Sequence, residues 1–117
     1  MRKNYKEYLI GGDMKNFKLI FDEIILNQLK KTGKNNLLKE LLSKIFDKIE
    51  NLGPMAGKLL DSHLQIYEIK LKHPPLRLYY KYNSSTNEIY LFEYEMKTSE
   101  KKQNKTLEKI RKFLSKT

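Results

Sequence analysis

The sequence predicts an α+β fold: a mostly antiparallel four-stranded sheet, a helical hairpin packed on one face of it, and a C-terminal helix. Two observations support this class. After one short strand pattern, apolar residues in the first half recur every three or four positions, which is typical of helices with one buried face. From residue 64 the period changes to two, which is typical of strands. The predicted element order is β-α-α-β-β-β-α.

The first half of the chain predicts one strand and a pair of helices. Residues 1–16 form an N-terminal arm to which the sequence assigns no element. Residues 16–21, NFKLIF, place Phe17, Leu19 and Phe21 on one face of an extended chain and predict the first strand. Helices are predicted over residues 23–32 and 35–52, the second of which stops at a Gly-Pro pair. We expect these two helices to form a hairpin with one apolar seam.

The second half predicts a meander and a last helix. Residues 64–71, 76–82 and 88–96 alternate as strands, and the segments between them contain prolines or short polar residues that favour turns. Antiparallel pairing is the simplest way to connect them. Residues 104–116 predict a helix whose apolar stripe docks on the sheet. Its lysine stripe either meets phosphates or faces solvent.

The middle strand, which contains RLYYKY, defines two surfaces of the sheet. Leu78, Tyr80 and Tyr82 point to one side, which we expect to be the core. The side chains between them point to the opposite side, called here the second sheet face, which we expect to be exposed. The members expected there are Arg77, Tyr79, Lys81, Glu68, Lys70, Glu93, Glu95 and Lys97.

Charge is the clearest compositional signal. The 117 residues carry a net charge of +10, which favours nucleic acid, an anionic membrane surface or an acidic protein as partner. Residues 97–117 hold eight Lys or Arg against two Glu, a net charge of +6, whereas residues 53–96 hold five of each sign. The positive charge is therefore concentrated at the C-terminus. A lysine-rich composition from an AT-rich genome is the alternative explanation for the excess.

Several classes of protein are excluded or disfavoured by residues that are absent. The chain has no cysteine, so it has no disulfide framework, thiolate metal site or thiol nucleophile. The N-terminal residues are too charged for a secretory signal, and no apolar run reaches the roughly 18 residues of a membrane span. Gly-rich phosphate loops and HExxH motifs are also missing. We expect one cytoplasmic domain over residues 1–117, with no metal site and no small-molecule cofactor.

Short motifs follow one another in a characteristic order along residues 17–115. They are LGP at the end of the second helix, the Gly57-Lys58 step, YEIK at residues 67–70, the strand with Arg77, and a last strand that leads to Lys97 and a charged helix. In this order they resemble the RelE/ParE toxin superfamily, close to its HigB-like, phage-derived branch. The sequence departs from that pattern where the middle strand begins LRLYY and where EMKT replaces paired lysines. The N-terminal arm has no counterpart in the family.

The resemblance implies the toxin of a type II toxin–antitoxin system. Such a toxin enters the ribosomal A site and cuts messenger RNA without a metal, by attack of the ribose 2′-OH on the scissile phosphate. The partners implied are a cognate antitoxin and mRNA on the ribosome, with no membrane and no cofactor. A ParE-like inhibitor of DNA gyrase that catalyses nothing, and an inactive RNA-binding relative, stay open as alternatives.

Catalytic roles follow from the resemblance and from side-chain chemistry. Arg77 is expected to stabilise the transition state, and Lys70 and Lys97 to position phosphate or transfer a proton. Glu68, or alternatively Glu93, would be the general base, and Tyr79 would stack on a base or donate a proton. The same cations and carboxylates could instead be cross-strand partners. The RNA-binding residues expected are Lys58, Lys81, Lys101, Lys102, Lys105, Lys109, Arg111 and Lys112.

Overall fold

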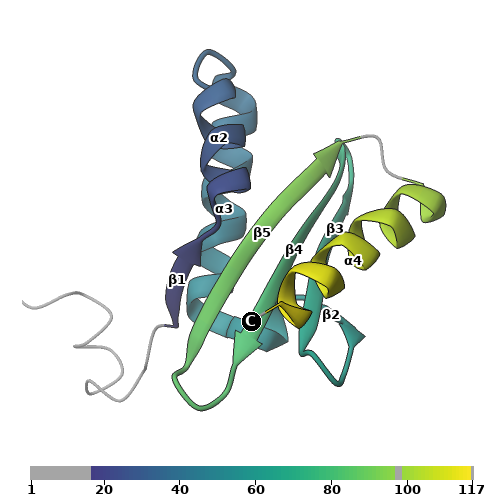
Figure 1. The fold of residues 1–117 in the computed structure, drawn as a ribbon. Coiled ribbons are helices and arrows are strands. Elements are labelled where there is room, and N and C mark those ends of the chain that lie inside the picture. The colour runs from purple at the N-terminus through teal and green to yellow at the C-terminus, as the bar shows by residue number, and fades with distance from the viewer. Residues whose placement is uncertain (1–16, 97–98, 117) are drawn as a thin grey trace, which may run out of the picture.

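The computed structural model describes residues 17–96 and 99–116, so the predicted N-terminal arm lies outside the described residues. A five-stranded sheet separates a helical hairpin from the C-terminal helix α4 (Figure 1). The strands are β1 (Lys18–Phe21), β2 (Lys58–Asp61), β3 (Ile66–Lys72), β4 (Pro75–Asn83) and β5 (Glu88–Met96). The helices are α2 (Glu23–Lys31), α3 (Asn36–Leu52) and α4 (Glu100–Ser115), and a short 3-10 turn, Gly53–Ala56, follows α3.

The strand order in the sheet is β1-β5-β4-β3-β2. The pairs β3–β4 and β4–β5 are antiparallel, as the meander predicts, and β1 lies parallel to β5. The α+β class, with a hairpin packed on one sheet face, is confirmed. The sequence prediction missed β2, because its four residues, KLLD, do not alternate in polarity. Helix α4 also begins four residues earlier than predicted, and the Ser99 side chain caps it by accepting from the Lys102 amide.

Local signals explain where the hairpin helices begin and end. The Asp22 carboxylate accepts from the Ile24 amide at the start of α2, and the Asn35 side chain accepts from the Leu38 amide at the start of α3. Gly53 ends α3 with a φ of +56°, a conformation that glycine adopts without steric cost. A Cβ on Gly53 would also lie 2.4 Å from the Phe17 ring. Glycine at this position therefore allows both the turn that ends α3 and the close approach of the Phe17 ring.

The hairpin covers the sheet face that was predicted to be the core. Leu78 and Tyr80 of β4 are fully buried against Ile25 of α2 and Ile49 of α3. Tyr82 packs at the margin of the same cluster. The even-numbered side chains of the middle strand therefore face the core, as the alternation predicts.

A β-bulge in β5 decides which of its side chains reach the other face. Tyr79 pairs with Glu93 and Tyr80 with Leu91, so Phe92 is an extra residue in β5. Leu91 and Tyr94 lie in the hairpin core, whereas Phe92 belongs to the cluster on the opposite side. The bulge thus turns Phe92 and Glu93 to the same side of the sheet.

Helix α4 covers the second sheet face, so the expectation that this face is exposed is wrong. Leu107 and Ile110 of α4 are buried against Tyr79 and Phe92. The prediction that the apolar stripe of the last helix docks on the sheet is confirmed, but it docks opposite the hairpin. No helix among residues 17–96 and 99–116 is long and apolar enough to cross a membrane.

Candidate active site

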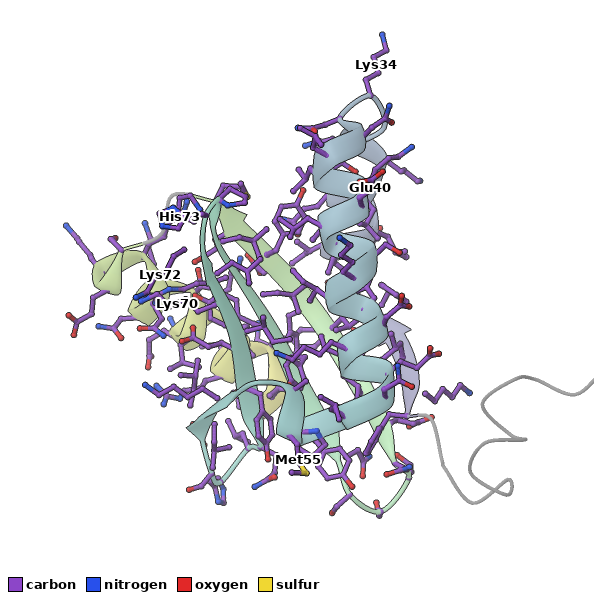
Figure 2. The ribbon with its side chains drawn as sticks, turned by 180° about the vertical axis from the view of Figure 1, so that it is seen from behind. Lys34, Glu40, Met55, Lys70, Lys72 and His73 are labelled. Carbon is purple, nitrogen blue, oxygen red and sulfur yellow. The ribbon has the colours of Figure 1, made fainter. Side chains whose placement is uncertain are left out.

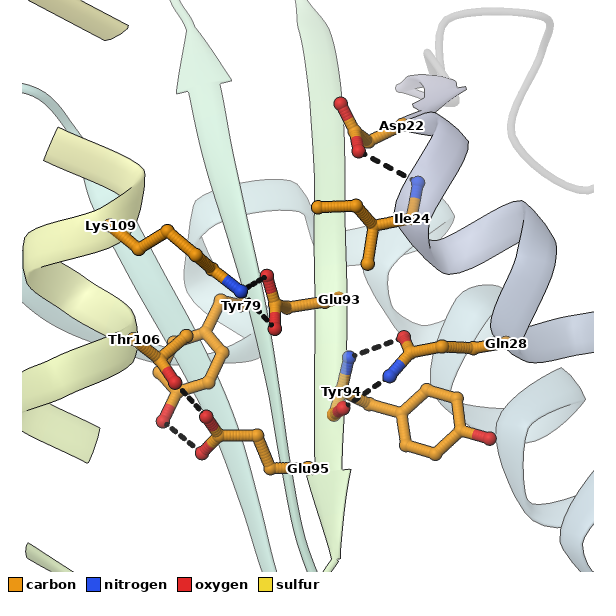
Figure 3. Close-up of polar contacts among 9 residues, drawn as sticks. All are labelled: Asp22, Ile24, Gln28, Tyr79, Glu93, Tyr94, Glu95, Thr106 and Lys109. Carbon is orange, nitrogen blue, oxygen red and sulfur yellow. Dashed lines mark hydrogen bonds and ion pairs between the residues drawn. The ribbon is translucent and has the colours of Figure 1, made fainter. Parts of the chain in front are cut away.

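A layer of polar contacts lies between the sheet and α4, where the sequence prediction placed an RNA-facing surface. The Tyr79 hydroxyl donates to Glu95 Oε2 at 3.0 Å, and the Thr106 hydroxyl donates to Glu95 Oε1 (Figure 3). Lys109 Nζ lies 2.7 Å from Glu93 Oε2. These contacts show why both carboxylates are buried: each is held by a donor.

Tyr79 is enclosed by this layer. Its side chain is fully buried, and burial, followed by the charge of Glu95, raises the pKa of its phenol well above the ordinary value of 10.0. The hydroxyl therefore stays protonated near neutral pH and is committed to Glu95. The expected stacking or proton-donating role of Tyr79 is not available to it in this arrangement.

Beside the first turns of α4, a cleft of about 380 Å³ brings several of the predicted site residues together. Arg77, Lys70 and Glu68 line it, and Lys58 of β2 lines it as well. Strand register explains this convergence, since Lys70 pairs with Arg77 across β3 and β4, and Lys58 pairs with Glu68 across β2 and β3. Figure 2 shows Lys70 on β3 from the side opposite to Figure 1. We call this the β3 cleft; its other lining residues are Lys48, Ala56, Gly57, Ile69, Leu71 and Gln103.

Gly57 permits the close approach of β2 and β3 at the cleft. A Cβ at this position would lie 2.4 Å from the Glu68 carbonyl oxygen and 2.7 Å from the Tyr80 hydroxyl. Any larger residue would push the start of β2 away from β3. Glycine at this step therefore places Lys58 beside the cleft.

Arg77 is the least satisfied polar group of the β3 cleft. Its side chain is 9% exposed, and its Nε and Nη1 atoms have no hydrogen-bond partner in the described part of the chain. Glu68 Oε2 lies 4.0 Å from Nη1, too far for a hydrogen bond. That same oxygen accepts a 2.9 Å hydrogen bond from Gln103 Nε2 of α4. The positive charge of Arg77 is therefore not neutralised by a short ion pair, and the part of the guanidinium that lines the cleft can bind an oxyanion.

The other predicted RNA-binding residues fall into two groups. Lys81 donates to the Leu64 carbonyl, Lys102 to the Met96 carbonyl, Arg111 pairs with Asp61 at 2.8 Å and with Glu108, and Lys109 pairs with Glu93, so these four have protein partners. The Arg111 hydrogen bond helps to lower the pKa of Asp61, after the larger effect of the Leu64 amide. Lys97 lies outside the described residues. The second group consists of Lys101, Lys105 and Lys112, which are exposed on α4.

Two residues that line the β3 cleft, Lys48 and Gln103, were not predicted as site residues from the sequence. Lys48 lies on the polar side of α3 and has no local signal that separates it from its lysine neighbours. Gln103 did carry a signal, because it lies one helical turn before Leu107 on the stripe that α4 buries. A polar side chain on a buried stripe requires a partner, and Glu68 is that partner.

Comparisons with known proteins bear on the fold. No protein-family model and no curated protein matches the chain. Among solved structures, the isolated RelE toxin of E. coli is 22% identical, with 80% of this chain and 98% of that chain covered and a TM-score of 0.56. The toxin–antitoxin complex RelBE2 of Mycobacterium tuberculosis is 15% identical, with 74% and 98% covered and a TM-score of 0.58. The intact E. coli RelBE complex is 24% identical, with 71% and 99% covered and a TM-score of 0.54. The chain therefore has the fold of the RelE toxins.

Proposed function

We propose that the protein is the toxin of a type II toxin–antitoxin pair and that it cuts messenger RNA in the β3 cleft. The shared fold supports this, because the structures that resemble the chain are RelE toxins, both isolated and in toxin–antitoxin complexes. The observation that carries the chemical part is Arg77, whose guanidinium has no short ion pair with Glu68 and lines a cleft that three lysines also line. Assignment to the HigB-like branch rests on the order of the sequence motifs.

The cleft supplies the groups that metal-free RNA cleavage needs. Arg77 would bind the scissile phosphate through the part of its guanidinium that lines the cleft and stabilise the charge of the phosphorane. Lys58 and Lys70 would hold non-bridging oxygens, or one of them would protonate the leaving 5′-oxygen. Glu68 would take the proton of the 2′-OH, since it is the carboxylate that lines the cleft. Tyr79 and Glu93 are left out of this scheme because their polar groups are bonded beneath α4.

The proposal also says how RNA would reach the cleft, where the protein would act and which protein it would bind. Exposed lysines of α4 would guide the RNA backbone toward the cleft, and Lys97, which follows β5 in the sequence, would add a phosphate contact. A substrate of messenger RNA on the ribosome implies a cytoplasmic protein. The cognate antitoxin would be the second partner.

The test is expression of the wild type and Arg77→Ala in cells, followed by mapping of new RNA 5′-ends. The wild type should arrest growth and create new ends within messages, and Arg77→Ala should lower cleavage by roughly 100-fold or more. Lys39→Ala, on the exposed side of α3, is the matched control and should cut like the wild type. Thermal melts of purified variants show whether each is folded.

Other outcomes point to other functions. Growth arrest without new RNA ends would refute cleavage and direct attention to a protein target such as DNA gyrase, whose supercoiling activity is then measured. Absence of arrest, together with RNA binding by the purified protein, would identify an inactive RNA-binding relative.

A further inference from the structure

The relation between Arg77 and Glu68 is unusual for a buried pair of opposite charge. Both side chains are at least nine-tenths buried, 9% and 5% exposed, yet the closest approach of Arg77 Nη1 to Glu68 Oε2 is 4.0 Å. Arginine and a carboxylate in such surroundings ordinarily form short, often bidentate hydrogen bonds. Here Nε and Nη1 of Arg77 have no partner in the described part of the chain. Something must keep the two groups apart.

Gln103 is positioned to do so. Its Nε2 donates to Glu68 Oε2 at 2.9 Å, and this is the oxygen that faces Arg77. The carboxylate is thus held toward α4. Gln103 is itself anchored, because Leu107, one turn later on α4, is buried against the sheet. Arg77, Glu68 and Gln103 all line the β3 cleft.

We propose that Gln103 is a positioning residue that withholds Glu68 from Arg77, so that the guanidinium, which lines the cleft, keeps its positive charge for an oxyanion there instead of spending it on an ion pair. The ligand class is a phosphodiester, which rests on the proposed function. The withholding itself does not depend on whether the RNA is cut. If Gln103 served only to attach α4, its removal would loosen the helix without changing the surroundings of the Arg77 guanidinium.

The test uses Gln103→Leu, which keeps side-chain size but removes the donor. Glu68 should then turn to Arg77 and form the missing ion pair. We expect the affinity for a short 2′-deoxy-substituted oligonucleotide, which cannot be cleaved, to fall about tenfold, the value of one charge-assisted hydrogen bond. The ¹H–¹⁵N resonance of Arg77 Nε should shift, and the melting temperature should stay equal or rise because a buried ion pair has been completed.

Two further variants separate positioning from simple attachment. Ile110→Ala weakens the apolar seat of α4 without touching the polar layer, so it should lower the melting temperature and leave the Nε resonance unchanged. The double variant Glu68→Gln with Gln103→Leu should recover most of the lost affinity, because a neutral amide competes poorly for the guanidinium.

The proposal is overturned if Gln103→Leu lowers stability while both the Nε resonance and the affinity stay as in the wild type, or if Glu68→Gln brings no recovery. If the wild type binds no oligonucleotide, the proposed function fails on that point. The Nε resonance then still decides this inference: a shift in Gln103→Leu supports the withholding of Glu68, and an unchanged resonance refutes it.

Discussion

The side chain of Gln28 on α2 forms two hydrogen bonds to the backbone of β5, beyond the part of β5 that pairs with β1. Replacing Gln28 measures how much these bonds contribute to the stability of the protein. Its Nε2 donates to the Tyr94 carbonyl at 2.8 Å, and its Oε1 accepts from the Tyr94 amide at 3.0 Å (Figure 3). Strand β1 pairs with β5 over Glu88–Leu91. Beyond that point the amide of Gln28 takes the place that the backbone of a neighbouring strand would occupy.

The change Gln28→Ala removes both hydrogen bonds and leaves two part-buried backbone groups without this partner. At about 1 kcal/mol for each hydrogen bond, the loss is about 2 kcal/mol. Alanine is the better helix former by a few tenths of a kcal/mol, so the net destabilisation should be about 1.5 kcal/mol. For a chain of this length that corresponds to a decrease in melting temperature of about 6 °C.

Thermal and urea denaturation, followed by circular dichroism, measure this change. The matched control is Asn27→Ala, since Asn27 is the exposed neighbour on the same helix and its replacement by alanine also raises helix propensity, somewhat more than that of Gln28. The control should be as stable as the wild type or slightly more so. Equal unfolding free energies for Gln28→Ala and Asn27→Ala, within about 0.5 kcal/mol, would refute the idea that Gln28 completes the edge of β5.

Two further predictions concern the docking of α4. Ile110→Ala should lower the free energy of unfolding by about 2–4 kcal/mol, because Ile110 is 2% exposed and its loss leaves a cavity between α4 and the sheet. Lys112→Ala, on the exposed side of the helix, should change it little. Equal unfolding free energies for the two variants in urea denaturation would contradict this prediction. Asp61→Asn should destabilise at pH 7 by breaking the ion pair with Arg111. The pKa of Asp61 is lowered from its ordinary value of 3.8, so its ionised form contributes stability above that value, and the difference between variant and wild type should shrink as the pH falls below about 3.8. A difference that persists at pH 2 in urea titrations would show that charge is not its cause.

Periodicity in the sequence was sufficient to predict the helices and strands that bury one face over several turns or several residues. The second hairpin helix and the three meander strands were predicted because their apolar residues recur over long stretches, and Leu78 and Tyr80 were assigned to the core correctly. Strand β2 was missed because four residues are too few to show a period, and its place is set by Gly57 and by pairing with β3.

The site was only partly predictable, for a different reason. Alternation along two adjacent strands placed Arg77, Lys70 and Glu68 on the same face, and the register of β3 and β4 keeps them together. What α4 does above that face depends on contacts between residues far apart in the sequence, such as Gln103 with Glu68 and Lys109 with Glu93. A single sequence records that such polar residues exist, but it does not record which of them meet.

Because α4 covers several carboxylates of the sheet, the docking of this helix affects the surface charge of the protein. With the helix in place, Asp61, Glu68, Glu93 and Glu95 are each bonded to one of its side chains, and the surface presented to solvent is lysine-rich. Without the helix, the same sheet face would present those four carboxylates beside Arg77, Lys70 and Lys81. Lifting α4 would therefore take away most of the local positive charge and uncover carboxylates, so an anionic strand would be attracted less strongly to the open state than to the closed one.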